Sequence, residues 1–324
     1  MSAVHGLLLL LTLLSVAHET HGFSSHTPSD RMVSVRSSMS TATGLFATND
    51  SPNDSSSALE RRSFLTTVGA FGLTALTAGS PTRAGAESQP TKVLVLGGTG
   101  LVGSEVVKKL RELNIDVVAT SRNGRDGTIA FDVLKEANVA TTVQGLAKDC
   151  TAVISTIGAI GTKDDEAING ATGLAISGAK AAGVKNFVYI GNAPEVAEWA
   201  QDFDFLQKYL AGKAFSTETL KSIFGGEDGT AYTLIGPTFI YGGDKFEVNP
   251  PRVASFYGQL VEAVLSSGPL RAATNVAPEG FIKIALEPPV SAASVGAAAV
   301  AGALGKAPAV LDTYDKIVDA AKAV

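Results

Sequence analysis

The run from Lys92 to Ser104 carries the residues of this chain best suited to hold a phosphate-bearing ligand. An apolar segment, KVLVL, gives way to closely spaced glycines in GGTGLVG, and a helix-like pattern follows. A diphosphate must lie almost against the backbone at a helix N-terminus, where free N–H groups stabilise negative charge and a Cβ would collide. The predicted diphosphate site consists of Gly97, Gly98, Thr99, Gly100, Leu101, Val102 and Gly103.

A second pair of residues has the chemistry of proton transfer. Tyr209 and Lys213 are separated by one turn of a predicted helix, so both side chains lie on the same face. A tyrosine with an ordinary pKa near 10 is a poor acid–base group at neutral pH, but a neighbouring cation stabilises the phenolate. The spacing therefore indicates a catalytic pair, and the alternative is a surface tyrosine beside a solvated lysine.

The end of the second predicted strand bears on nucleotide choice. Arg122 stands where many dinucleotide-binding domains place an acidic residue against a ribose 2′-hydroxyl. Here the position has a cation next to the hydroxyl of Ser121, which suits a 2′-phosphate and favours NADP over NAD. The alternative is an exposed loop whose arginines meet only water.

The pattern of the chain predicts how these residues are positioned. Strand and helix signals alternate, which is typical of a doubly wound parallel sheet with helices on both faces, an α/β fold. Strands are expected at 92–96, 116–121, 128–132, 151–157, 186–190 and 232–235, and helices at 167–182, 205–224, 253–265 and 291–304. The helix at 291–304 is so rich in small residues that it must pack closely on an apolar surface. A small C-terminal cap is expected from about residue 237.

Composition excludes several kinds of site. The chain has four histidines, the last of them His26, and one cysteine, Cys150. Histidine general bases, Ser-His-Asp triads, His-ligated metals and disulfides within residues 87–324 are therefore excluded, and no metal is expected. The formal net charge is −5 and no long basic run occurs. Nucleic acid is thus an unfavourable partner.

The first 86 residues have the features of targeting segments. The apolar stretch 7–16 predicts a signal peptide over 1–22, and the Ser/Thr-rich residues 23–60 predict a disordered transit segment. Arg61-Arg62, a mildly apolar stretch and the small residues before Glu87 predict a twin-arginine export signal over 61–86. The series resembles a three-part address to the thylakoid lumen of a plastid. A stromal or mitochondrial address, or an anchor at 64–78, is the alternative.

Several motifs together resemble a family. They are GGTGLVG, VISTIGA, the helix containing Ile168-Asn169-Gly170, GVKNFVYIGNA, YLAGK and YTLIGPTFIYG. The set is similar to the extended and atypical short-chain dehydrogenase/reductases (SDRs). Within these it is most similar to plastid and mitochondrial NAD(P)-binding proteins related to the coenzyme Q biosynthesis accessory protein and to the Rossmann-type accessory subunit of complex I. The resemblance covers roughly residues 92–317.

The resemblance implies roles for particular residues. Gly97, Gly100 and Gly103 would contact the diphosphate, Arg122 the adenosine ribose, Asp132 the adenine, and Thr156 and Gly158 the ribose near the fourth strand. Tyr209 and Lys213 match the catalytic pair, with Lys213 also on the nicotinamide ribose. One position departs from the family, because Asn192 stands after Gly191 where active members carry a serine. Its amide is the candidate donor to a substrate carbonyl.

Two functions follow from these observations. The first is an NADP(H)-dependent oxidoreductase acting on a carbonyl or quinone. A lipophilic substrate is suggested by the apolar residues Pro237, Phe239, Ile240, Tyr241, Pro250, Phe256 and Phe281, although most of these are expected in the core. The second is a non-catalytic NADP(H)-binding subunit of a membrane complex or a quinone-biosynthesis assembly. The sequence leaves the oligomeric state open.

Overall fold

The structure is a computed structural model and describes residues 92–324 apart from 227–228, 249–250 and 279. The predicted signal, transit and export segments lie outside the described residues. The central feature is a seven-stranded parallel sheet with the strand order β11-β6-β5-β4-β1-β2-β3. Its strands are β1 Lys92–Leu96, β2 Asp116–Ser121, β3 Ile129–Ala130, β4 Ala152–Ser155, β5 Asn186–Ile190, β6 Ala231–Ile235 and β11 Val310–Leu311.

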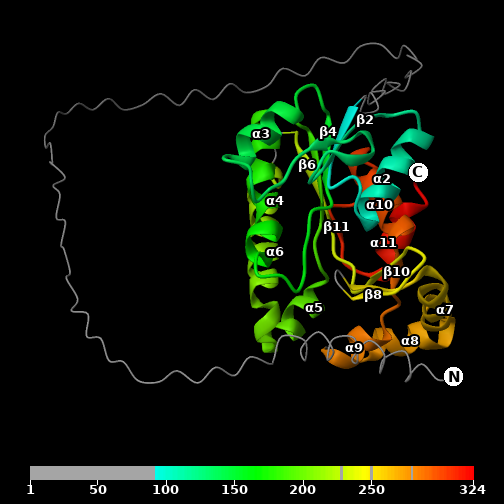
Figure 1. Cartoon of the computed structure of the whole chain (residues 1–324). Helices are drawn as coiled ribbons and strands as arrows, with labels where there is room; N and C mark the ends of the chain where they lie inside the picture. Colours follow the sequence, from blue (N-terminus) through cyan, green and yellow to red (C-terminus); the bar gives the residue numbers. More distant parts are fainter. Residues whose placement is uncertain (1–91, 227–228, 249–250, 279) are drawn as a thin grey trace, which may run out of the picture. The chain divides into compact units, whose positions relative to one another are not determined.

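Helices cover both faces of this sheet (Figure 1). One face carries α2 (Leu101–Glu112), α10 (Ala292–Ala303) and α11 (Tyr314–Ala321), and the other carries α3 (Val139–Leu146), α4 (Asp165–Ala181) and α6 (Gln207–Phe224). The strand order runs outward in both directions from the neighbours β1 and β4. A ligand site is expected beyond the carboxyl ends of these strands, because the connections diverge there. The predicted doubly wound α/β fold is confirmed.

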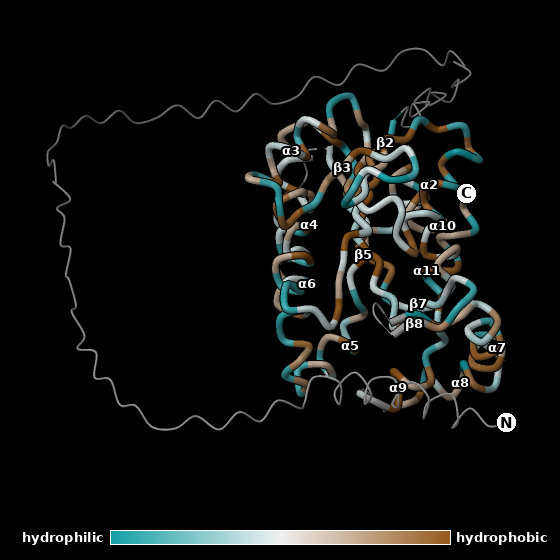
Figure 2. The backbone as a smooth tube through the Cα atoms, in the orientation of Figure 1, coloured by the Kyte–Doolittle hydropathy of each residue, from teal (hydrophilic) through white to brown (hydrophobic). Residues whose placement is uncertain are grey.

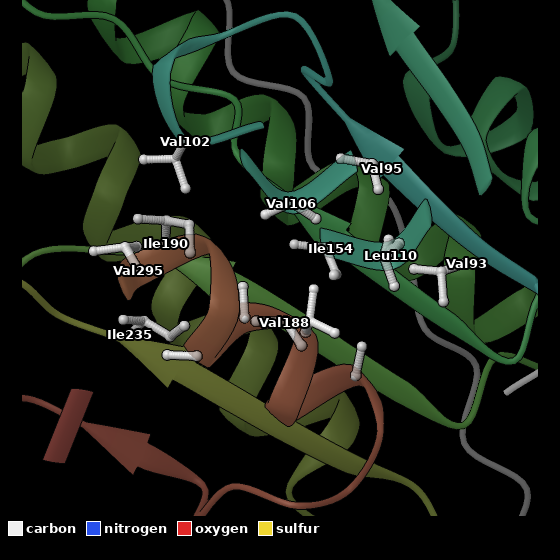
Figure 3. Packing of buried hydrophobic residues seen from close by; sticks show 14 of the residues in the cluster. Val93, Val95, Val102, Val106, Leu110, Ile154, Val188, Ile190, Ile235 and Val295 are labelled. Atoms are coloured by element: carbon white, nitrogen blue, oxygen red, sulfur yellow. The ribbon is translucent and has the colours of Figure 1, made fainter. Parts of the chain in front are cut away.

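Each strand supplies side chains to two cores, because alternate residues point to opposite faces. In β5, Val188 packs with α2 and α10, whereas Phe187 and Tyr189 pack with α4 and α6. Figure 3 shows the first core, in which Ile154 and Val188 of the sheet gather with Val106 of α2 and Val295 of α10. Figure 2 shows the same division, with apolar residues along β5 and polar residues on the outer side of α6.

The small residues of α10 allow it to lie close to its neighbours, as the sequence predicted. A Cβ on Gly296 would be 3.1 Å from the backbone nitrogen of Val106 in α2. A Cβ on Gly302 would be 2.8 Å from the side chain of Thr233 in β6. The helix is thus held between α2 and the sheet by its glycines and alanines.

The chain after residue 237 divides into two parts. The segments β7 (Ile240–Tyr241), β8 (Glu247–Val248), β9 (Pro251–Arg252) and β10 (Val290–Ser291) form small sheets outside the main one. The helices of this part are α7 (Ser255–Leu265), α8 (Gly268–Val276) and α9 (Phe281–Leu286). The later elements α10, β11 and α11 return to the main sheet, where β11 pairs with β6. The strands β7 to β10 are therefore outside the main sheet, and the cap from about residue 237 stays a prediction.

The remaining elements are short and lie in the connections. They are α5 (Pro194–Trp199) and the 3-10 turns η1 (Arg125–Gly127), η2 (Ala200–Asp202) and η3 (Asp204–Leu206). None of the helices in the described part of the chain has the length and apolar character that crossing a bilayer requires.

Candidate functional site

The glycine turn between β1 and α2 has the close backbone packing that its sequence predicted. Gly97 has a φ of +84°, a conformation that residues with side chains rarely adopt. A Cβ on Gly103 would lie 2.1 Å from the carbonyl oxygen of Gly97, so only glycine fits there. Helix α2 begins after Gly100 without a side-chain cap. The first N–H groups of the helix thus remain suited to an anion.

The other predicted residues of the turn have different surroundings. A Cβ on Gly98 would lie 2.9 Å from Ala119 of β2, so Gly98 serves strand packing. The side chain of Val102 is buried in the core, and Leu101 packs against the same core. Only the backbone of these two residues is therefore placed to meet a ligand.

Two threonines from neighbouring strands hold the turn in place. The hydroxyl of Thr156, after β4, donates to the carbonyl oxygens of Leu96 at 2.9 Å and Gly97 at 3.1 Å. The hydroxyl of Thr120 in β2 accepts from the N–H of Gly97 at 3.3 Å. Thr156 was predicted to bind a ribose, and in the structure its proton is directed to the backbone of the turn. Thr120 was not predicted, because a threonine inside a strand carries no distinguishing signal.

The loop after β2 contains two arginines, one of which contacts the glycine turn. Arg122 is exposed, and Arg125 donates to the hydroxyl of Thr99 at 3.3 Å and to its carbonyl oxygen at 3.4 Å. Ser121 is buried and shares a 2.7 Å hydrogen bond with the hydroxyl of Thr128. Ser121 therefore shapes this loop, while the two guanidinium groups provide its positive charge.

Asp132 follows β3 at the position predicted for the adenine. Its carboxylate accepts from the N–H of Leu134 at 3.2 Å and pairs with Lys135 at 3.2 Å. Desolvation opposes ionisation, but these two partners and the more distant charge of Arg122 together lower the pKa of Asp132. The group is thus an anion near neutral pH.

The loop after β4 is tied to the start of α4 by two buried side chains that the sequence did not single out for a role. Asp165 accepts from the N–H of Gly161 at 2.7 Å, and from the N–H and hydroxyl of Thr162 at 3.0 and 2.6 Å. Asn169 donates to the carbonyl oxygens of Ala159 and Asp165, each at 2.7 Å. Together they fix the loop that contains Gly158.

Gly158 and Lys213 lie next to each other. A Cβ on Gly158 would be 3.3 Å from Oδ1 of Asn169 and 3.6 Å from Nζ of Lys213. The missing side chain thus opens space beside the lysine at the carboxyl end of β4. This places two predicted ligand-binding residues, Gly158 and Lys213, in one location.

Lys213 is held at the end of β5 by the chain itself. The side chain is buried, and Nζ donates to the carbonyl oxygen of Ile190 at 2.8 Å. Nζ also lies 4.9 Å from the ring centre of Tyr189 and 5.8 Å from that of Tyr209. Burial lowers the pKa of Lys213 to about 8. The group is therefore a cation at pH 7, although a readily deprotonated one.

Tyr209 shares its helix face with Lys213, as the spacing predicted. Burial, together with the negative charge of Asp165, raises the pKa of Tyr209 to about 12. Nζ of Lys213 lies 5.8 Å from the centre of its ring, and stabilisation of the phenolate by this cation stays a prediction. Tyr209 is thus a neutral phenol over the physiological pH range.

Asn192, the candidate carbonyl donor, follows β5 at the predicted position. Its side-chain amide donates to the carbonyl oxygen of Ala193 at 3.3 Å. Its backbone is tightly packed, because a Cβ on Gly236 would lie 2.7 Å from the Asn192 carbonyl oxygen. The amide is partly exposed and has a further N–H, so its donor capacity is not exhausted.

The residues of the predicted apolar pocket that the structure describes differ in their surroundings. Tyr241 is buried and its hydroxyl bonds to Glu262, whereas Phe256 is 69% exposed. Pro250 and the side chain of Phe281 lie outside what the structure describes. Within the described residues, no cluster of His, Cys, Asp and Glu is arranged to hold a metal ion.

Comparisons with known proteins agree with this geometry. Residues 97–254 match a family model described as NAD(P)H-binding, over just under half of the chain. The match begins at the glycine turn and spans β2 through β6 together with Lys213. This part of the chain is therefore similar to NAD(P)H-binding domains, and its doubly wound parallel sheet is of the Rossmann type.

The individual proteins to which the chain is similar are distant. An uncharacterized chloroplastic protein of Arabidopsis thaliana is 32% identical over 185 residues, which cover 54% of this chain and 59% of that protein. Among solved structures, MoeE5 with UDP-glucose and NAD has a TM-score of 0.45 at 17% identity, covering 68% of this chain and 74% of MoeE5. UDP-glucose 4-epimerase of Brucella ovis with NAD has a TM-score of 0.44 at 16% identity, covering 66% and 73%.

Proposed function

We propose that this chain is an NADP(H)-dependent oxidoreductase that reduces a carbonyl or quinone-type lipophilic small molecule. The observation that carries the proposal is the position of Lys213, whose buried ammonium is fixed at the carboxyl end of β5, next to Gly158 and one helical turn from Tyr209. A buried cation beside a phenol is an arrangement suited to proton transfer.

The residues present fit a dinucleotide. The first turn of α2 would hold the diphosphate, Asp132 the adenine, and Thr156, Gly158 and Lys213 the ribose groups. Arg122 and Arg125 favour NADP over NAD, because Arg125 contacts the turn, Arg122 lies three residues before Arg125 in the same loop, and either cation could pair with a 2′-phosphate. The nicotinamide would supply hydride chemistry when bound.

The chain's own residues would supply the proton. Tyr209 stays protonated at neutral pH, so its hydroxyl is available to donate. Lys213 would stabilise the phenolate that donation leaves behind, since a cation next to an anion lowers the cost of ionisation. Asn192 would donate to the substrate oxygen from its side-chain amide. The expected activity is oxidation of NADPH in the presence of a panel of quinones and aldehydes.

A second candidate function has support from Asn192. The position after Gly191 carries an amide that already bonds to Ala193, where SDR enzymes carry a serine. A chain that binds NADP(H) without turnover would act as an accessory subunit of a membrane complex or of a quinone-biosynthesis assembly, stabilised by its bound nucleotide. Absence of turnover with every acceptor, while NADPH still raises the melting temperature, would favour this function.

We also infer a plastid location. The relative from Arabidopsis is named as chloroplastic, and residues 23–60 have the Ser/Thr-rich composition of a transit segment. Arg61-Arg62 and the small residues before Glu87 support onward export to the thylakoid lumen. The twin-arginine route suits this cargo, because a Rossmann protein must stay folded to keep its nucleotide.

A further inference from the structure

Two consecutive residues of β5 contact the same ammonium group. Ile190 accepts a hydrogen bond from Nζ of Lys213 at 2.8 Å, and the ring of Tyr189 lies 4.9 Å from that nitrogen. The ring of Tyr209 is farther from it, at 5.8 Å. A cation within about 6 Å of an aromatic ring centre is attracted by the electrons of the ring. β5 therefore binds the lysine with both its backbone and a side chain.

The hydroxyl of Tyr189 does not explain why a tyrosine ring is present. Tyr189 is completely buried, and its hydroxyl has no hydrogen-bond partner in the structure. Ser216, a polar side chain next to this hydroxyl, donates to the carbonyl oxygen of Asn169 at 2.8 Å and accepts from the N–H of Gly173 at 2.9 Å. A buried hydroxyl without a partner destabilises a fold. The ring of Tyr189 packs with α4 and α6, and its contact with Lys213 is the one polar interaction that the described part of the chain gives this side chain.

We propose that Tyr189 is a positioning residue that holds the ammonium of Lys213 through its aromatic ring. The inference rests on the proposed function, since Lys213 is the residue assigned to the ribose and to Tyr209. With one N–H directed to Ile190 and the ring of Tyr189 behind it, the remaining donors of Lys213 are available toward Gly158, whose Cβ position lies 3.6 Å from Nζ.

Few titratable groups lie near Lys213 to influence its protonation. In the described part of the chain, the titratable groups around it are Tyr189 on β5, Tyr209 on α6 and Asp165 on α4, whose carboxylate is bound to Gly161 and Thr162. Burial opposes the ammonium and the ring of Tyr189 favours it. Removal of the ring should therefore lower the pKa of Lys213 further, by about one pH unit.

The test is an NMR titration of the side-chain nitrogen of Lys213 in the nucleotide-free chain, with its signal assigned by its loss in Lys213→Met. Tyr189→Phe keeps the ring, so the midpoint of the Lys213 titration should equal that of the parent protein. Tyr189→Leu should move it about one unit lower and, because fewer of the lysines are then charged, weaken NADPH binding about 5-fold at pH 8. An unchanged midpoint in a folded Tyr189→Leu variant would overturn the proposal.

A series of fluorinated phenylalanines at position 189 keeps the test decisive if Tyr189→Leu does not fold. Fluorine withdraws electrons from the ring at nearly constant shape, so the midpoint should fall with each added fluorine. A titration midpoint of Lys213 that does not change with fluorination would refute the proposal that the ring holds the ammonium. The titration needs no nucleotide, so its outcome is separate from that of the proposed function, which fails if the parent chain does not bind NADPH.

Discussion

The ammonium of Lys213 donates a 2.8 Å hydrogen bond to the carbonyl oxygen of Ile190, which joins helix α6 to the carboxyl end of β5. The bond crosses from an outer helix to the last residue of a central strand. It fixes a buried cation at the carboxyl ends of the strands, where the glycine turn after β1 also lies. The proposed chemistry depends on this placement, because Tyr209 precedes Lys213 by one turn of the same helix.

Tyr209→Phe should separate catalysis from binding. Removal of a general acid typically lowers the rate by a factor of about 10² to 10⁴. The ring remains, so the NADPH dissociation constant and the melting temperature should change little. NADPH oxidation with quinone and aldehyde acceptors is the measurement, and Tyr232→Phe, a half-buried tyrosine of β6, is the matched control. An unchanged rate in Tyr209→Phe would contradict the assigned proton donor.

Lys213→Met should alter the pH dependence of stability. The folded-state pKa of Lys213 is about 8, below its ordinary value of 10.5, so the folded chain releases this proton before the unfolded chain does. The parent's free energy of unfolding, relative to that of Lys213→Met, should therefore rise between about pH 8 and pH 10 and be lowest below pH 8.

Urea unfolding of both proteins at pH 7, 8.5 and 10 measures this difference. The exposed Lys208→Met serves as the control, because its removal deletes one lysine from the same helix without the burial. A difference between parent and Lys213→Met that stays constant over this range would show that Lys213 is not a desolvated cation.

Arg122→Ala and Arg125→Ala should each reduce the preference for NADPH. Loss of a hydrogen bond between charged groups weakens binding by about 10- to 100-fold, and NADH lacks the 2′-phosphate that would form it. Calorimetric titration with both nucleotides measures the ratio, with the exposed Arg111→Ala on α2 as control. Equal affinities of the parent chain for NADPH and NADH would refute the preference itself.

If the export prediction holds, the compartment that the protein reaches depends on Arg61 and Arg62. Replacement of both by lysine should stop the protein before the lumen and leave residues 61–86 attached. Subfractionation of plastids locates the protein, and N-terminal sequencing shows whether residues 61–86 are still attached. The same compartment and the same mature N-terminus in parent and variant would contradict the export signal.

Much of this fold was predictable because its signals are local. The boundaries of β2 and β5 match the prediction, since apolar runs bounded by turn residues specify buried parallel strands. The glycine turn was predictable for the same reason, because its steric demands involve neighbouring residues. The spacing of Tyr209 and Lys213, one turn of a helix, also predicted that the two side chains share a helix face.

The parts that were not predicted depend on contacts between distant segments. The return of β11 to β6 needs a two-residue strand, too short to leave a periodic signal. Arg125 contacts Thr99, 26 residues away in the sequence, and Tyr189 of β5 contacts Lys213 of α6. The raised pKa of Tyr209 likewise comes from burial and from Asp165 on another helix. No spacing rule contains such information.

The most direct test of the central claim is calorimetric titration of the purified chain with NADPH, alongside Gly103→Ala and Gly145→Ala. The Cβ of Gly103→Ala would lie 2.1 Å from the carbonyl oxygen of Gly97, whereas that of Gly145→Ala in α3 meets nothing within 4 Å. The account predicts binding in the parent and in Gly145→Ala, and a loss of at least about 100-fold in Gly103→Ala, because a turn forced open no longer fits a diphosphate. No NADPH binding in the parent, or equal affinity in a folded Gly103→Ala, would contradict it.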